Sequence, residues 1–187
     1  MPKCRICKES FTRSRPLQAI CSKFECAVEL ANRSQAKRLA KELKIEKKQT
    51  IERKEKLKTR SKWIKEAQSA FNAYIRERDK DKLCICCPTP LSSAQIGGGF
   101  DCGHYRSVGS APHLRFDPNN AHGQTKKCNR WGSGRAVDYR IGLIARIGLE
   151  AVEALEADNT IHKWTIDELR AIKAFYVAKL KELKDRI

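Results

Sequence analysis

This sequence of 187 residues contains no long apolar segment. No run reaches about 18 apolar residues, the length at which a segment becomes a candidate for spanning a bilayer. The N-terminal residues Met1–Cys4 also lack the apolar stretch of a secretory signal. We therefore expect a protein that stays in the reducing cytoplasm and does not associate with a membrane.

Acidic and aromatic residues are scarce as well. The 22 Asp and Glu are outnumbered by 39 Lys and Arg, and the net charge of +17 favours binding to a polyanion. A membrane surface is disfavoured, because the N-terminus has no amphipathic stretch with Trp, Phe and Leu opposite a lysine face. An RNA-binding factor is disfavoured, because no aromatic-rich strand motif for base stacking is present. DNA is therefore the expected partner.

Cysteine, in contrast, is abundant. In a reducing compartment nine cysteines indicate metal ligands or buried thiols rather than disulfides, and an odd number cannot pair completely. The pairs Cys4/Cys7 and Cys21/Cys26 have the spacing of a four-cysteine zinc site. Because residues 1–26 are too few to bury a core, a bound zinc ion would supply the folding free energy of this segment. The alternative is a disordered tail with scattered thiols.

Glycine and proline are absent from residues 27–60, the second predicted segment. This stretch is rich in Ala, Leu, Lys, Glu and Gln, and it predicts a long basic helix. The helix has two interpretations, which can hold together. It is a solvated linker, or its Lys and Arg side chains follow a phosphate backbone.

The third predicted segment, residues 61–187, carries the globular part of the protein. An apolar stripe from Trp63 to Ile75 predicts a helix with Ser61 as its N-cap. The centre, residues 84–135, is rich in Gly, Pro, Ser and Asn and predicts short strands and loops. The residues after it predict further helices, the last of which opens with a capping box at Thr165–Glu168. We expect an α+β fold, mostly α-helical, in which these C-terminal helices pack on the Trp63 helix.

A second zinc site is predicted in the centre. Cys84, Cys87 and Cys128 offer three thiolates, but Thr125 stands where a second Cys-x-x-Cys pair would begin. Threonine is not a useful zinc ligand, so another side chain is expected to complete the site. The candidates are His122, Cys86 and Cys102. The alternative is a set of buried thiols without metal.

A catalytic site is predicted between these cysteines. His104 is the candidate general base, because a neutral imidazole titrates near cellular pH. Asp101 and Asn129 are candidate ligands for Mg²⁺ or Mn²⁺, which prefer oxygen donors. Asp101 precedes His104 by three residues, so we expect a bulge or bend at Gly103 to bring the two together. We expect Asn120 or Asn119 to orient the ring of His104.

The central segment resembles the HNH, or ββα-metal, nucleases, whose motif positions match His104, Asn120 and Asn129. Over nearly its full length the sequence is similar to the lambdoid-phage NinG (Rap) family of recombination nucleases. The matching tracts are the four N-terminal cysteines, the basic segment, Ser61–Gln68, Phe71–Asp79, Gly103–Arg106, Leu114–Phe116, Asn120, Cys128–Asn129, Ser133–Gly134 and Trp164–Thr165. The family pattern has a cysteine in place of Thr125, a difference that weakens the zinc site.

The resemblance implies a structure-specific, metal-dependent endonuclease that acts on branched DNA such as Holliday junctions and D-loops. It also implies a phage protein in a bacterial host, with phage or host recombination proteins as partners, and symmetric cutting would suit a homodimer. The basic residues that flank the predicted site, and that are expected to hold phosphates, are Arg106, Arg115, Lys126, Lys127, Arg130 and Arg135. The alternative is a non-catalytic, zinc-stapled DNA-binding protein that mediates recombination.

Overall fold

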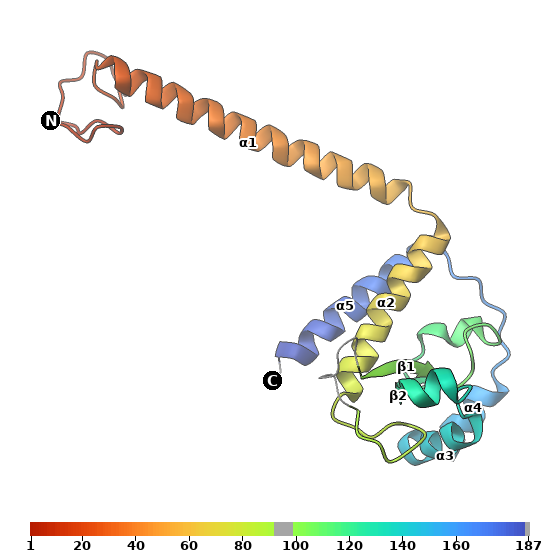
Figure 1. The fold of residues 1–187 in the computed structure, drawn as a ribbon. Coiled ribbons are helices and arrows are strands. Elements are labelled where there is room, and N and C mark those ends of the chain that lie inside the picture. Colours follow the sequence, from red (N-terminus) through yellow and green to blue (C-terminus); the bar gives the residue numbers. More distant parts are fainter. Residues whose placement is uncertain (92–98, 186–187) are drawn as a thin grey trace. The chain divides into compact units, whose positions relative to one another are not determined.

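The structure is a computed structural model that describes residues 1–91 and 99–185 (Figure 1). The chain divides into two compact units, Met1–Lys58 and Thr59–Ile187. Within the described residues, no helix has the length and apolar character needed to cross a membrane. The fold is α+β and mostly helical, as the sequence predicted.

The first unit consists of N-terminal loops followed by helix α1 (Phe24–Lys56). The helix predicted for the basic segment is therefore present and continuous, consistent with its lack of glycine and proline. Arg53, Lys54 and Lys56 lie in its last turn, where they interact favourably with the helix dipole. Cys26 is its only buried residue, so α1 has no apolar face packed within the unit.

The second unit contains a pair of long helices, α2 (Arg60–Asp79) and α5 (Ile166–Asp185), which lie side by side (Figure 1). Thr59, rather than Ser61, caps α2, because its side chain accepts a hydrogen bond from the backbone N–H of Lys62 at 3.3 Å. The predicted capping box of α5 is confirmed by reciprocal hydrogen bonds between Thr165 and Glu168. The core between the helices is formed by Trp63, Ala67, Phe71, Ile75, Leu169 and Tyr176.

A two-stranded antiparallel hairpin stands beside α2. Strand β1 (Phe100–His104) pairs with β2 (Ala121–Thr125) in a regular register in which Phe100 faces Thr125 and His104 faces Ala121. The connection contains a 3₁₀ helix, η1 (Pro112–Phe116), and a π-helical turn, η2 (Lys127–Trp131), follows β2. These elements agree with the short strands and loops predicted for the centre.

Helices α3 (Ala136–Ile147) and α4 (Leu149–Ala157) belong to a different core from α5. They pack with the loop that carries Cys84, in a cluster that includes Ile85, Leu91, Phe100, Tyr139, Leu143, Val152 and Leu155. The expectation that all C-terminal helices pack on α2 is therefore wrong for α3 and α4. One reason is the close approach at Gly142, where a Cβ would lie only 1.9 Å from the Ile85 carbonyl oxygen.

Candidate functional site

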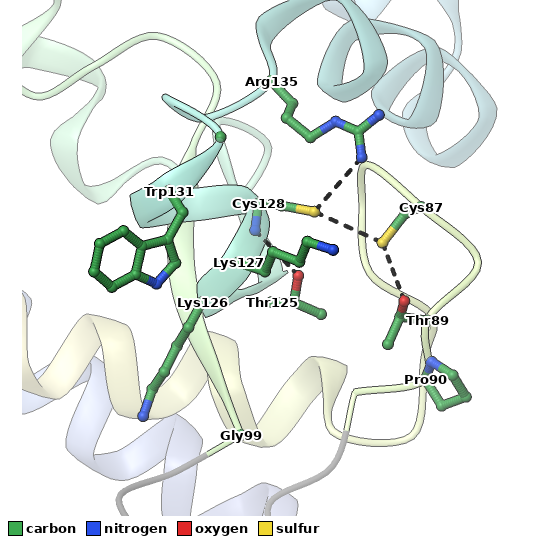
Figure 2. A pocket seen from close by; sticks show the side chains of 11 residues that line it. Cys87, Thr89, Pro90, Gly99, Thr125, Lys126, Lys127, Cys128, Trp131 and Arg135 are labelled. Carbon is green, nitrogen blue, oxygen red and sulfur yellow. Dashed lines mark hydrogen bonds between the residues drawn. The ribbon is translucent and has the colours of Figure 1, made fainter.

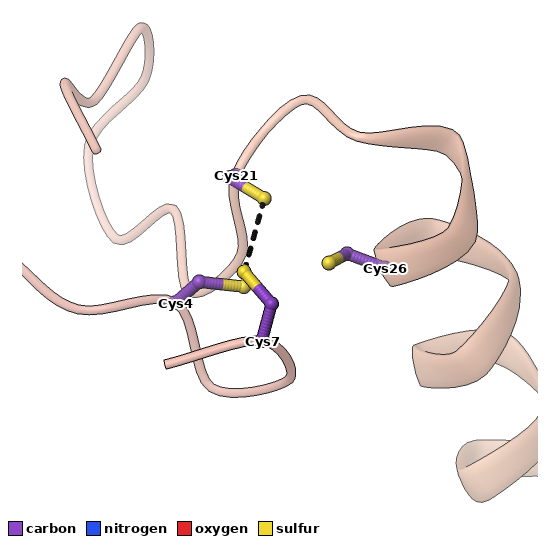
Figure 3. A group of neighbouring side chains, drawn as sticks. All are labelled: Cys4, Cys7, Cys21 and Cys26. Carbon is purple, nitrogen blue, oxygen red and sulfur yellow. Dashed lines mark hydrogen bonds between the residues drawn. The ribbon is translucent and has the colours of Figure 1, made fainter. Parts of the chain in front are cut away.

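Four cysteines gather at the N-terminus, as their spacing predicted (Figure 3). The sulfurs of Cys4, Cys7, Cys21 and Cys26 all lie within 4.8 Å of one another, and those of Cys7 and Cys21 are 3.8 Å apart. A tetrahedral zinc ion with Zn–S bonds of about 2.3 Å holds its sulfurs about 3.8 Å apart. The four thiols therefore have a geometry that can hold a zinc ion.

Three further cysteines gather in the second unit. Cys84 and Cys87 come from the turn after α2 and Cys128 from η2, and their sulfurs also lie within 4.8 Å of one another. The Cys87 and Cys128 sulfurs are 3.7 Å apart, again the separation expected around zinc (Figure 2). Hydrogen bonds, the largest from the Cys86 thiol, lower the pKa of Cys84 to about 4, which favours the thiolate that a metal needs.

None of the three side chains considered as a fourth ligand lies in this cluster. Cys86 instead accepts a hydrogen bond from Gln124 Nε2 at 2.8 Å, and Cys102 packs against the core of α2. Thr125 is the side chain that stands beside the three sulfurs, with its Oγ1 at 3.8 Å from Cys84 Sγ. The structure thus brings together a three-thiol site with a hydroxyl next to it.

His122 takes part in a buried charge network rather than in the cysteine cluster. Arg78 donates to its Nδ1 at 3.1 Å, and its Nε2–H donates to the Asn119 carbonyl oxygen at 3.1 Å. Burial, followed by the charge of Arg78, lowers the pKa of His122 to about 4 and keeps the ring neutral at pH 7. Both ring nitrogens are occupied, so the expectation that His122 binds zinc is wrong.

Asp79 is the centre of this network, and sequence reasoning missed it. Its carboxylate has no exposed surface and accepts hydrogen bonds from Arg78 (2.8 Å), Lys82 (2.9 Å) and the Gly123 backbone (2.8 Å). The signal was present in the sequence, because Asp79 continues the four-residue spacing of Phe71 and Ile75 along the buried face of α2.

His104 has a defined tautomer. Its Nε2–H donates to the backbone carbonyl oxygen of Arg115 at 3.0 Å, so Nδ1 carries the free lone pair. Burial beside the ring of Phe71 lowers the pKa of His104 and favours the neutral form. His104 is half-buried, and its Nδ1 makes no hydrogen bond within the described residues. A neutral ring with an unprotonated Nδ1 is the form of histidine that can accept a proton.

Neither asparagine predicted to orient His104 does so. Asn120 is fully buried, accepts from the Arg106 N–H at 2.8 Å and donates to the carbonyl oxygens of Arg106 and Leu114. It thus holds the loop between β1 and β2 in place. The Arg115 carbonyl orients His104 instead, because the loop folds back over the end of β1.

Asp101 and Asn129, the two predicted ligands of a catalytic ion, do meet. Asn129 Nδ2, on η2, donates a hydrogen bond to Asp101 Oδ2, on β1, at 3.1 Å. Arg130 donates to both oxygens of the same carboxylate, at 2.8 and 3.1 Å. Burial raises the pKa of Asp101, but these hydrogen bonds outweigh it and lower the pKa overall. The carboxylate is therefore ionised and already engaged by a cation.

The bulge expected at Gly103 is absent, because β1 pairs with β2 without interruption. Gly103 instead leaves room for the buried side chain of Gln124, whose Oε1 would lie 2.2 Å from a Cβ at this position. Side chains three residues apart on a regular strand point to opposite faces, and their Cα atoms are about 10 Å apart. An ion bound by Asp101 and Asn129 would therefore lie on the other face of the hairpin from the His104 ring, contrary to expectation.

The predicted phosphate-binding residues fall into two groups. Arg106 donates to the Leu155 carbonyl oxygen at 2.9 Å and to Asn159 at 3.1 Å, so its guanidinium has a structural role. Arg115 donates to Gln68 at 3.2 Å, and Arg130 pairs with Asp101. The other three, Lys126, Lys127 and Arg135, line one pocket of about 710 Å³ together with Cys87, Thr125, Cys128 and Trp131 (Figure 2). This pocket is the basic surface closest to the cysteine cluster in the described part of the unit.

Comparison with known proteins identifies the family of this chain. The family model "Bacteriophage Lambda NinG protein" matches residues 1–186. Protein ninG of Escherichia phage 933W is 45% identical over 198 residues, which cover 98% of this chain and 94% of that protein. Protein ninG of Salmonella phage P22 is 54% identical over 133 residues, which cover 71% of this chain and 63% of that protein. No solved structure matches the chain. The resemblance to NinG seen in the sequence is confirmed, and the chain belongs to the NinG family of bacteriophage proteins.

Proposed function

We propose that this protein is a metal-dependent endonuclease that cleaves branched DNA, such as Holliday junctions and D-loops, during phage recombination. The observation that carries the proposal is the state of His104. Its Nε2–H is held by the Arg115 carbonyl, its lowered pKa favours the neutral ring, and the half-buried side chain keeps Nδ1 unprotonated. A neutral imidazole positioned in this way can take a proton from the water that attacks a phosphodiester.

Asp101 and Asn129 are the side chains that would hold Mg²⁺ or Mn²⁺, since both carry oxygen atoms and their side chains meet. Asn129 would have to turn its amide to bind an ion, because Nδ2 now faces Asp101. The ion supplies positive charge for the phosphate oxygens as negative charge builds on them. Arg130 occupies both oxygens of Asp101, so it has to move when an ion binds. The hairpin followed by η2, with Asn129 in that turn, is the part we propose to be HNH-like.

A second candidate is the non-catalytic, zinc-stapled DNA-binding protein. Two observations favour it: Arg130 neutralises Asp101, and the regular register of β1 puts Asp101 and His104 on opposite faces. In this alternative the basic pocket and α1 bind branched or duplex DNA without cleaving it. Partners among phage or host recombination proteins, a homodimer, and a place in the host cytoplasm are proposals under either candidate.

The two candidates differ in what His104→Gln does to a labelled four-way junction in Mg²⁺ or Mn²⁺. The glutamine amide can still donate to the Arg115 carbonyl but cannot accept a proton near pH 7. We therefore expect cleavage to fall by about 10²-fold or more while junction binding is unchanged. Cleavage would be measured on a denaturing gel and binding by fluorescence anisotropy.

The matched control is His162→Gln, which changes another partly exposed histidine outside the hairpin and should cleave normally. If His104→Gln cleaves at the normal rate, His104 is not the base. If the unaltered protein binds the junction tightly and does not cleave it in either metal, the non-catalytic candidate is correct.

Binding to DNA should weaken steeply with salt, because lysine–phosphate contacts release counterions. Lys37 and Lys41 lie one turn apart on the exposed surface of α1. Changing both to glutamine should reduce the slope of log affinity against log salt by roughly 2. The pair Lys181 and Lys184 on α5 changes the net charge equally and serves as the control. An equal loss of slope in both variants would remove α1 from the DNA-binding surface.

A further inference from the structure

We propose that zinc in the central cluster is bound by three thiolates only, and that its fourth position opens into the basic pocket and takes a water that an oxyanion such as phosphate can replace. This position is separate from the proposed catalytic residues. The proposal concerns how the protein holds zinc and does not depend on endonuclease activity.

The first argument is the number of thiols. In the described part of the chain, the metal-ligating atoms that meet at this place are the sulfurs of Cys84, Cys87 and Cys128. The Cys86 thiol hydrogen-bonds to Cys84, but it also accepts a hydrogen bond from Gln124 and does not belong to the set of mutually close sulfurs. His122 is held by Arg78. Zinc prefers four ligands, and sites with three protein ligands complete their coordination with water or substrate.

The second argument is the state of Thr125. Its Oγ1 lies 3.8 Å from Cys84 Sγ, which is compatible with the separation of two neighbouring ligands around zinc. The same oxygen accepts a hydrogen bond from the Cys128 backbone N–H at 3.3 Å. A neutral threonine hydroxyl is a weak ligand for zinc. It can instead hydrogen-bond to a water or an anion that binds the metal beside it.

The third argument is access. The pocket of about 710 Å³ is lined by Cys87, Thr125 and Cys128 themselves, so a small molecule that enters it reaches the metal position directly (Figure 2). The N-terminal cluster differs in this respect, because four sulfurs already surround its centre (Figure 3). The central zinc is therefore the one that can exchange a ligand with solvent.

The fourth argument is charge. A zinc ion with three thiolates has a net charge of −1, which by itself would repel an anion. Lys126, Lys127 and Arg135 line the same pocket, and Arg135 Nη1 lies 4.0 Å from Cys128 Sγ. These cations make the site positive in total, so an oxyanion can approach the metal and form charge-assisted hydrogen bonds.

Cobalt substitution of the full-length protein tests the proposal, because the visible spectrum of Co²⁺ reports its ligands. The N-terminal cluster contributes a constant four-sulfur signal. In the unaltered protein we expect inorganic phosphate to shift the absorption bands of the Co²⁺ ion that is bound in the central cluster. In Thr125→Cys a fourth thiolate should complete the site, so that phosphate has no effect and competition with a chelator shows at least about tenfold tighter zinc binding.

Two further variants test whether the oxygen ligand is the Thr125 hydroxyl or a water, and whether the effect of an added thiol depends on its position. Thr125→Val lacks the hydroxyl but should keep a three-sulfur, one-oxygen spectrum, because the oxygen belongs to a bound water. Thr160→Cys adds a thiol at an exposed position outside the cluster and should bind zinc like the unaltered protein. The proposal is overturned if the unaltered protein already shows two four-sulfur sites, or if phosphate leaves its spectrum unchanged. It is also overturned if Thr125→Val loses the oxygen ligand.

Discussion

Replacing Asp79 with asparagine is expected to lower the free energy of unfolding of the second unit by about 3–5 kcal/mol. The carboxylate is fully buried and is shared by Arg78, Lys82 and the Gly123 backbone, with Arg146 at 3.6 Å. Asparagine keeps the shape but not the charge, so the partly buried Arg78 loses its counterion. The loss is large because an unpaired buried charge retains its full desolvation cost.

The effect should depend on pH in a definite direction. Burial raises the pKa of Asp79, but the hydrogen bonds and charge of Arg78 outweigh it and hold the pKa well below the usual range. A carboxylate with a depressed folded pKa stabilises the protein above its unfolded pKa of about 3.9 and loses that contribution as the pH falls through the folded value. The difference between the variant and the unaltered protein should therefore be full at pH 7 and shrink below about pH 4.

Urea unfolding followed by tryptophan fluorescence would measure this difference. Asp81→Asn is the matched control, because Asp81 is exposed and only two residues away, and it should change the free energy of unfolding by less than about 0.5 kcal/mol. If both variants have the same midpoint and slope, the buried network around Asp79 contributes little to stability.

The double change Cys7→Ser and Cys21→Ser should unfold the N-terminal loops. Outside the four-cysteine cluster, the described loops before α1 have one isolated strand pairing, Lys3 with Ser10, and little buried surface. Structural zinc contributes an apparent binding free energy of about 10–16 kcal/mol in zinc-finger peptides, and here the same free energy would order the loops. We expect the zinc content to fall from two ions per chain to one, and the amide resonances of residues 1–23 to lose their dispersion.

Cys102→Ser is the control for this experiment, since Cys102 lies outside both clusters. It should keep both zinc ions even if it destabilises the core of α2. The thermal unfolding of the second unit should be unchanged by the N-terminal variant, because the two units have separate cores. Retention of two zinc ions, or of dispersed resonances in residues 1–23, would contradict a metal-dependent fold of this segment.

Local patterns predicted the helices well where the apolar spacing was strong. The stripe of α2 from Trp63 to Ile75 and the capping box of α5 both depend on residues within one or two turns. The packing of α3 and α4 was not predictable in the same way. Their apolar faces suit either core, and the contact of Gly142 with Ile85 joins residues far apart in the sequence.

The features of the candidate site also differ in whether the sequence predicted them. Cysteine spacing predicted both clusters, because two thiols in a tight turn already face one metal. The roles of Asn120, His122 and Arg106 were not visible, because their hydrogen-bond partners lie far away in the chain or are backbone groups of a loop. A buried polar side chain has to be satisfied by whatever the fold brings to it, and this decides whether it is structural or free to react.

The sequence by itself determined the family, the basic character and the long helices, since these depend on composition or on neighbours a few residues apart. It also indicated the two groups of thiols, because each contains a Cys-x-x-Cys pair. Tertiary structure alone decided that Asp101 and His104 lie on opposite faces of the hairpin, that Arg115 orients His104, and that His122 joins a charge network instead of the central cluster. The physical reason is that strand register, loop closure and hydrogen-bond partners are set by contacts between distant segments, which no local pattern encodes.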